Sequence, residues 1–409
     1  AADPSGKAGT AALALNLLDD GTETRHTFRI ADELDAIGAR ISTGSSLDLS
    51  FVRLSALSSS LPPALRVMAD VVQHPAFPAD LVTLEKKRQQ AQIGQEKAQP
   101  VAAALRVLPR LLYGSGHAYG NPLSGSGDDR VVAALTRDEL IAWHRAWFKP
   151  NASTLIVTGD VTMATLKPAL EAAFGTWARG EAPEKAIGAV PTATGGRVYL
   201  IDKPDAPQSV IVAAHTTEKG GAAQDLAIEA VIRNFGGIAT SRLNRNLRLE
   251  KHWSYGTQGV MAATRGPRPF YIVAPVQTDK TRESIVEIVK ELKGVAGDRP
   301  LAGDEFASAM RGQTLSLPGR FETLDALEAA AVQLVNLGYG DDYFSTYATR
   351  VRGLTEPALA AAASAYIRPQ HVLWVIVGDL EKVEAGIRDL KLGEVIRLDA
   401  DGEPITGTR

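Results

Sequence analysis

An internal repeat constrains this chain more than any other feature of its sequence. Residues 135–160 align without a gap to residues 354–379, at an offset of 219, and eight of the 26 aligned pairs are identical. Pro150 and the dipeptide Gly159-Asp160 are among the identical positions, and two unrelated amphipathic helices would not place them in register. The repeat therefore predicts two tandem homologous halves within the 409 residues.

Both copies of the repeat predict the same local structure. A threonine, Thr136 or Thr355, precedes a segment whose first turn carries acidic or proline residues, as expected of a capped helix. Each helix should end before the next proline, Pro150 or Pro369, because the residue before a proline disfavours helical geometry. A short apolar, β-branched run then leads into Gly-Asp, which predicts a buried strand and its turn.

The segment between the halves is rich in Pro, Gly, Ala and Thr and lacks an apolar period, which is typical of a linker. We therefore predict an N-terminal domain over residues 1–180, a linker over residues 181–196 and a homologous C-terminal domain over residues 197–409. The length agrees with this division, since a single domain commonly holds ~100–200 residues.

Strands and helices are mixed in each half without strict alternation, which favours an α+β fold over a doubly wound parallel sheet. The expected strands are short apolar runs: Phe51–Leu57, Leu155–Thr158, Val198–Ile201, Ser209–Ala214, Phe270–Val276 and Leu373–Val377. The expected helices are longer amphipathic runs: Thr27–Ile37, Pro62–Gln73, Pro78–Glu96, Arg137–Trp147, Gly221–Asn234, Lys280–Val295, Leu301–Leu315 and Thr323–Leu337.

Composition excludes several classes of function. The chain has no cysteine, which excludes disulfides, thiolate zinc sites and cysteine nucleophiles. Its 44 basic and 47 acidic residues give a net charge of −3, so we expect no broad basic surface for nucleic acid. No apolar run approaches the ~18–20 residues that a membrane-spanning helix needs.

The usual catalytic motifs are absent from the sequence. The seven histidines are His26, His74, His117, His144, His215, His252 and His371. No two of them lie three to five residues apart, as a helical zinc pair requires, so each is expected to be a surface or a hydrogen-bonded core residue. The glycine-rich stretches match neither a phosphate loop nor a nucleophile elbow.

One local cluster has chemical potential. Arg248 and Tyr255 lie seven positions apart, about two helical turns, which would place both on one side of a helix end. A guanidinium and a phenol are hydrogen-bond donors suited to a carbonyl oxygen. From the residues alone, the ordinary alternative is a surface arginine and an interfacial tyrosine.

Markers spread along the chain occur in the order typical of one family. They are Asp3–Gly9, Leu18–Thr22, Glu33–Ala39, Tyr113–Gly120, Thr136, Pro150–Asp160 and the Arg248/Tyr255 pair. In these the chain resembles the pitrilysin/insulinase family of zinc metallopeptidases, and within it the short bacterial two-domain subunits. Those are similar to the mitochondrial processing peptidase and to the core proteins of the cytochrome bc complex. The resemblance implies that each tandem domain is a mainly antiparallel sheet with helices packed on one face.

The zinc motif of that family, an inverted H-x-x-E-H helix followed later by a glutamate, is degenerate here. Ala12 and Asn16 stand at the two histidine positions, Leu15 at the general-base position and Gln92 at the last ligand position. Alanine and leucine have no donor atom, and neutral amides suit Zn²⁺ poorly. Glu85 stands where the family often keeps a second acidic residue. The resemblance therefore implies that this chain holds no metal and no other cofactor.

The Arg248/Tyr255 pair, in contrast, is intact. In the family the tyrosine is suited to stabilising the oxyanion and the arginine to holding a substrate carbonyl, opposite the zinc of the other half. In heterodimeric bacterial members one subunit carries Zn²⁺ and the other carries this pair. The resemblance thus implies a zinc-lacking subunit that is inactive alone and completes a peptide-binding chamber with a zinc-bearing partner.

Other expectations stay open at this stage. One alternative is a non-enzymatic structural or chaperone-like peptide-binding protein, against which the retained pair argues. Another is a homodimeric enzyme that uses other residues, for which no base and nucleophile emerge. Family members carry a strand before the segment that starts at Asp3, so we expect residues to precede it. The compartment is not encoded in these residues, and analogy favours the bacterial periplasm over the cytoplasm.

Overall fold

The structure, a computed structural model, describes residues 2–190 and 196–405. The chain forms two compact units that each mix helices and strands, which confirms the predicted α+β fold with tandem domains. The first unit holds Ala1–Gln95, Asn121–Ala186 and Leu327–Val332. The second unit holds Glu96–Gly120, Ile187–Ala326 and Gln333–Arg409.

The two units draw on both halves of the sequence. Glu96–Gly120 comes from the first half of the sequence but belongs to the second unit. Leu327–Val332 comes from the second half of the sequence but belongs to the first unit. Within the predicted linker, residues 191–195 lie outside the described part of the chain, and residues 181–190 form no helix or strand. The boundaries at 180 and 197 remain predictions about the sequence.

The first unit packs its helices around a two-stranded antiparallel hairpin of β1 (Arg40–Ser45) and β2 (Ser50–Ser55). Its helices are α1 (Thr10–Asn16), α2 (Thr27–Asp35), α3 (Leu61–Gln73), α4 (Ala79–Ala98), α6 (Asp129–Ala134), α7 (Arg137–Trp147) and α8 (Met163–Phe174). Helix α1 is almost entirely apolar and contacts both α7 and β1, so it forms the centre of this core.

The second unit contains a mixed sheet in the order β5-β6-β4-β7-β3-β8. Its strands are β3 (Arg197–Asp202), β4 (Gln208–Thr217), β5 (Gln258–Met261), β6 (Arg268–Gln277), β7 (Leu373–Gly378) and β8 (Glu394–Leu398). The pairings from β5 through β7 are antiparallel, whereas β3 runs parallel to both β7 and β8. The sheet is therefore mainly antiparallel, as the family resemblance implies.

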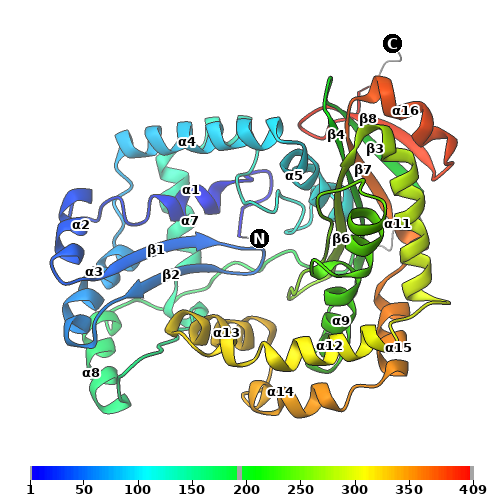
Figure 1. The fold of residues 1–409 in the computed structure, drawn as a ribbon. Coiled ribbons are helices and arrows are strands. Elements are labelled where there is room, and N and C mark those ends of the chain that lie inside the picture. The colour runs from blue at the N-terminus through cyan, green and yellow to red at the C-terminus, as the bar shows by residue number, and fades with distance from the viewer. Residues whose placement is uncertain (1, 191–195, 406–409) are drawn as a thin grey trace. The chain divides into compact units, whose positions relative to one another are not determined.

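Helices cover both faces of this sheet. Besides α5 (Pro100–Tyr113), the helices from residue 197 onward are α9 (Ala222–Ile232), α10 (Arg242–Asn244), α11 (Thr281–Ala296), α12 (Asp304–Leu315), α13 (Leu324–Leu337), α14 (Tyr343–Arg352), α15 (Glu356–Tyr366) and α16 (Leu380–Asp389). Ile211 and Ala213 of β4 join the core under α11, whereas α5 contacts β4 and β7 from the other side (Figure 1). Helix α11 thus packs on one face of the sheet, and α5, from the first half of the sequence, covers the other face.

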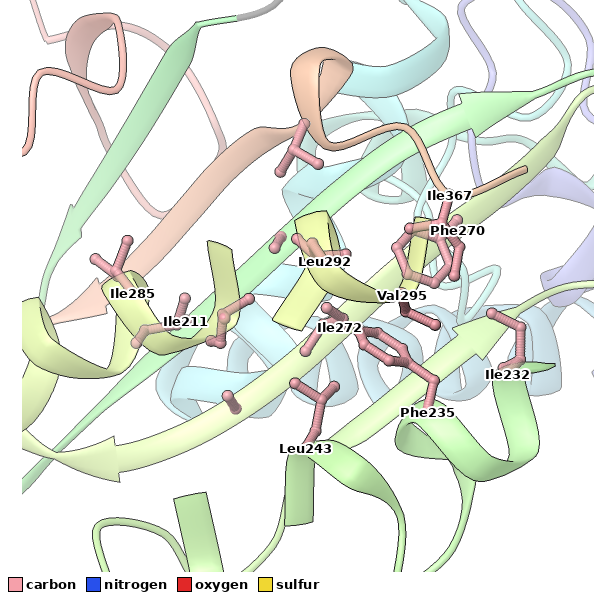
Figure 2. Close-up of a cluster of buried hydrophobic side chains, with 14 of the residues drawn as sticks. Ile211, Ile232, Phe235, Leu243, Phe270, Ile272, Ile285, Leu292, Val295 and Ile367 are labelled. Atoms are coloured by element: carbon pink, nitrogen blue, oxygen red, sulfur yellow. The ribbon is translucent and has the colours of Figure 1, made fainter. Parts of the chain in front are cut away.

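The core under α11 joins the sheet to the helices around it. Figure 2 shows part of it, with Phe270 and Ile272 of β6 close to side chains of several helices. Every second residue of β4 and β6 points into this core because strand side chains alternate between faces. At about 25 cal/mol per Å² of apolar surface removed from water, such burial is the main favourable contribution to folding of the unit.

The repeat is visible in the structure. Helices α7 and α15 begin and end at positions 219 apart, and the 3₁₀ turns η2 (Pro150–Ala152) and η7 (Pro369–His371) correspond in the same way. Thr136 accepts a hydrogen bond from the amide of Glu139, and Thr355 accepts one from the amide of Ala358. The capped helix and its proline stop are therefore confirmed in both copies.

The predicted strand Leu155–Thr158 is wrong. Residues 153–158 form no strand, and the Leu155 side chain is 49% exposed. Its counterpart β7 is buried because it pairs with β4 on one side and β3 on the other. Residues 153–158, by comparison, belong to neither of the two sheets in the described part of the chain. A strand without a partner leaves its backbone groups unpaired, and none forms here.

All predicted helices occur, with ends shifted by a few residues, and so do the other predicted strands. Strands β1, β5 and β8 were not predicted, nor were helices α5, α6, α8, α10, α14 and α16. Among the described residues, no helix combines the length and the apolar character that crossing a membrane requires.

Candidate functional site

Arg248 and Tyr255 lie in one segment of the second unit. Arg248 belongs to the π-helical turn η4 (Arg245–Glu250), and Tyr255 lies in the loop of residues 251–257 that joins η4 to β5. The helix stops at Glu250, so it does not extend over the two turns from Arg248 to Tyr255 that the sequence spacing suggested. His252 then takes a φ of 58°, in the left-handed region, which a helix cannot continue.

Apolar anchors attach this segment to the core. Leu243 and Leu247, one turn apart, are buried with Phe235 of the turn η3 (Arg233–Gly237). Figure 2 shows Phe235 and Leu243 close to Ile272 of the sheet. Because these side chains occupy the inner side of the helical turns, Arg248 lies on the exposed side.

The loop that carries Tyr255 is tied to its surroundings on both sides. The Trp253 amide donates to the Leu247 carbonyl at 2.9 Å, and the Gln277 amide donates to the Trp253 carbonyl at 2.9 Å. Ser254 Oγ donates to the Pro275 carbonyl at 2.6 Å and accepts from the Gly256 amide at 3.1 Å. The loop backbone is therefore held by η4 and by β6, while the Tyr255 side chain is 89% exposed.

Acidic residues of α11 hold η4 from the other side. Asn246 Nδ2 donates to Glu287 and to Glu291, both at 2.8 Å, and Lys251 pairs with Glu287 at 3.5 Å. Burial raises the pKa of Glu287, but hydrogen bonds from Asn246 and Lys290 outweigh it and hold that pKa below its ordinary value. Glu287 is thus ionised at neutral pH and fixes the turn that presents Arg248.

The four degenerate metal-site positions lie in the first unit. Ala12, Leu15 and Asn16 belong to α1, and Gln92 is an exposed residue of α4. The Leu15 side chain is fully buried in the apolar core. Asn16 Nδ2 donates to Glu85 Oε1 at 3.1 Å, so α1 and α4 are joined here by an amide and a carboxylate.

This set of side chains does not fit Zn²⁺, which takes thiolate, imidazole or carboxylate ligands. Two of the four side chains have no donor atom, and the other two are neutral amides. Within residues 2–190 and 196–405, no group of three or more His, Asp or Glu residues is arranged to hold a metal ion.

The buried histidines serve the fold. His144 bonds through Nε2 to the Val72 carbonyl at 2.8 Å, and His215 Nε2 accepts from the Arg368 amide at 3.2 Å. Burial lowers the pKa of His144 and of His215 to about 4, so both rings are neutral at physiological pH. Each is a hydrogen-bonded core residue, as the sequence predicts.

Three buried polar residues around the loop were missed in the sequence. Asn244, Ser254 and Thr257 are each more than nine-tenths buried and hydrogen-bond the backbone near Tyr255. For Asn244 the sequence offers one indication of burial, because this residue directly follows the core residue Leu243. A polar side chain buried there needs hydrogen-bond partners inside the protein.

Two models of one peptidase family match most of the chain. Residues 1–126 match the model described as insulinase (peptidase family M16), and residues 134–312 match the one described as peptidase M16 inactive domain. The chain belongs to peptidase family M16. The predicted membership of the pitrilysin/insulinase family is thereby confirmed.

Relatives of this M16 chain carry zinc-protease names. It is 25% identical over 295 residues to an uncharacterized zinc protease of Mycobacterium leprae, an alignment that covers 71% of this chain and 65% of that protein. It is 27% identical over 258 residues to one of Mycobacterium bovis, covering 62% of this chain and 58% of that protein. The aligned region is thus less than two thirds of the length of these relatives.

Solved structures share the fold. A peptidase M16 inactive domain from Pseudomonas fluorescens superposes with a TM-score of 0.83 at 19% identity, covering 91% of this chain and 89% of that one. A protease from Helicobacter pylori superposes with a TM-score of 0.82 at 14% identity, covering 92% and 90%. At these identities the likeness establishes the architecture alone.

Proposed function

We propose that this M16 chain is the zinc-lacking subunit of a heterodimeric metallopeptidase and presents Arg248 and Tyr255 to the zinc site of a homologous partner. The observation that carries the proposal is the setting of Tyr255. Its side chain is 89% exposed, yet it lies between the buried residues Ser254 and Thr257 on a backbone held by hydrogen bonds. A large aromatic side chain held outside the fold in this way is suited to a ligand or a partner.

The two side chains have complementary roles in this proposal. The Tyr255 phenol donates a hydrogen bond to the substrate carbonyl oxygen as that oxygen gains negative charge. The Arg248 guanidinium binds a neighbouring peptide carbonyl and keeps the substrate extended. A donor that is fixed before the reaction needs no reorganisation when charge develops, which is where catalysis gains most from such groups. Zinc bound by the partner supplies the hydrolytic chemistry.

Tyr255→Phe tests the proposal most directly. A tagged form of this chain is mixed with the H-x-x-E-H-bearing chain that co-purifies with it, and peptide turnover is measured. We expect kcat to fall about a hundredfold, because one oxyanion donor is lost. Tyr271→Phe, which removes a phenol from β6 of the same unit, is the matched control and should leave kcat unchanged.

Other outcomes would contradict the proposal. Unchanged turnover of Tyr255→Phe would remove the assigned role. Stoichiometric zinc and peptide cleavage by the isolated chain would overturn the zinc-lacking assignment. Peptide binding without any zinc-bearing partner would favour the structural or chaperone-like alternative.

A further inference from the structure

Asn244 is the most completely hydrogen-bonded side chain near the candidate site. It is 4% exposed, in α10, directly before η4. Its Nδ2 donates to the Thr257 carbonyl at 2.9 Å, to the Ile238 carbonyl at 3.0 Å and to Ser241 Oγ at 3.2 Å. Its Oδ1 accepts from the Thr257 amide at 2.7 Å and from Thr257 Oγ1 at 3.3 Å. The amide therefore uses both its donors and both its acceptor sites.

The bonds to Thr257 fix the far end of the Tyr255 loop. Asn244 pairs with both the N–H and the C=O of Thr257, as a neighbouring strand would, one residue before β5 begins. The near end of the loop is fixed where the Trp253 amide bonds the Leu247 carbonyl. Tyr255 lies between these two attachments, so its backbone position depends on both.

The loop conformation requires such attachments. His252 is held in the left-handed region, which residues other than glycine populate sparsely, and a conformation of this kind persists only where surrounding contacts enforce it. Alanine or leucine at position 244 would leave both backbone groups of Thr257 without this partner inside the protein.

We infer that Asn244 is a positioning residue that sets the place of the Tyr255 phenol through its paired hydrogen bonds to Thr257. The inference rests on the function proposed above for Tyr255. Asn244 itself does not touch the reacting atoms. Its effect on catalysis passes through the loop, and the loop can be measured separately from the activity.

The first test is amide hydrogen exchange on the isolated chain. In Asn244→Ala the Thr257 amide loses its acceptor, and its exchange should become at least about tenfold faster. The control is Asn234→Ala, which removes another buried carboxamide of the same unit, one that donates to the Ala230 carbonyl. The control should not change exchange at residues 255–257. Unchanged exchange in Asn244→Ala would overturn the inference.

The second test is a double-mutant cycle on turnover by the heterodimer. Asn244→Ala should lower kcat at least about tenfold with little change in KM, and should have almost no further effect in a Tyr255→Phe background. Asn244→Asp keeps the acceptor for the Thr257 amide and should lie between the wild type and alanine in both tests. It also serves if Asn244→Ala does not fold.

The outcomes separate the two proposals. Faster exchange with unchanged kcat, in a complex that loses activity in Tyr255→Phe, would refute the role of Asn244 and leave the proposed function intact. Full activity of Tyr255→Phe would refute the proposed function, while the exchange experiment would still report whether Asn244 holds the loop.

Discussion

At the scale of single residues, burial separates the two predicted parts of the site. Leu15, at the former general-base position, has no exposed surface and belongs to the core of the first unit. Tyr255 has the opposite setting, an exposed side chain on a hydrogen-bonded backbone. Helix α1 thus serves as a packing element of the first unit, whereas Arg248 and Tyr255 are exposed.

We predict that Leu15→Glu strongly destabilises the chain. The carboxylate would enter an apolar core without a hydrogen-bond partner, and we expect a loss of at least about 3 kcal/mol in the free energy of unfolding. Asn16→His is the control, because residue 16 is exposed and loses only its bond to Glu85. Its expected loss is about 1 kcal/mol. Chemical denaturation measures both, and a Leu15→Glu chain as stable as Asn16→His would contradict the prediction.

At the scale of elements, the repeat shows that helix signals are local and strand signals are not. Helices α7 and α15 have corresponding bounds, because a cap and a proline stop act within a few residues. The apolar runs that follow them differ in secondary structure. The run at residues 373–378 becomes β7 between two partner strands, and the run at residues 153–158 forms no strand.

We predict unequal effects of removing the two caps. Thr136 has a capping box, in which Glu139 accepts from the Thr136 amide at 2.7 Å and also pairs with Lys7. Hydrogen bonds from Lys7 and from Thr136 lower the pKa of Glu139 to about 2. Thr355 has no such partner, because Ala358 stands at the corresponding position.

Thr355→Ala should therefore reduce the free energy of unfolding by about 1 kcal/mol, and Thr136→Ala by more, within the range of about 0.5–2 kcal/mol for lost caps. Urea denaturation followed by circular dichroism compares them. The matched control is Thr83→Ala, a threonine within α4 whose hydroxyl bonds only its own helix. An equal or larger loss in Thr355→Ala would contradict the role of the capping box.

At the scale of the whole molecule, each compact unit has its own core and its own buried, neutral histidine. His144 belongs to the first unit and His215 to the second. Both have a pKa of about 4 in the folded chain because burial disfavours the charged ring. The ordinary pKa near 6.5 returns on unfolding, so both units depend on pH in the same direction.

We predict that stability falls as the pH is lowered from about 6.5 to about 4. In this window the unfolded chain binds more protons than the folded chain, so stability falls with pH. Below about pH 4 the stability contributed by the two neutral histidines is fully lost. Each histidine contributes at most about 3 kcal/mol. Denaturation at several pH values should show that stability depends less steeply on pH in His144→Gln and in His215→Gln than in the wild-type chain. If the dependence of stability on pH were unchanged in both His144→Gln and His215→Gln, the prediction would be contradicted.

Local patterns in the sequence account for most of the fold. Apolar periodicity and caps placed every predicted helix close to its observed bounds. Strands β1, β5 and β8 were missed because they are short and partly exposed. Helix α5 was missed because Pro109 interrupts its pattern, although tertiary contacts with β4 and β7 keep it helical.

The sequence by itself determined the family and the tandem domains, and it alone nominates Arg248 and Tyr255 and predicts that zinc ligands are missing, because each of these depends on which residue stands at which position. Only the tertiary structure decided that Tyr255 lies beyond the helix, on a loop fixed by Asn244 and Ser254. It alone also showed that residues 153–158 form no strand. The position of the loop depends on hydrogen bonds between residues that are distant in sequence. A strand likewise forms only where partner strands are available, and neither kind of pairing leaves a periodic pattern along the chain.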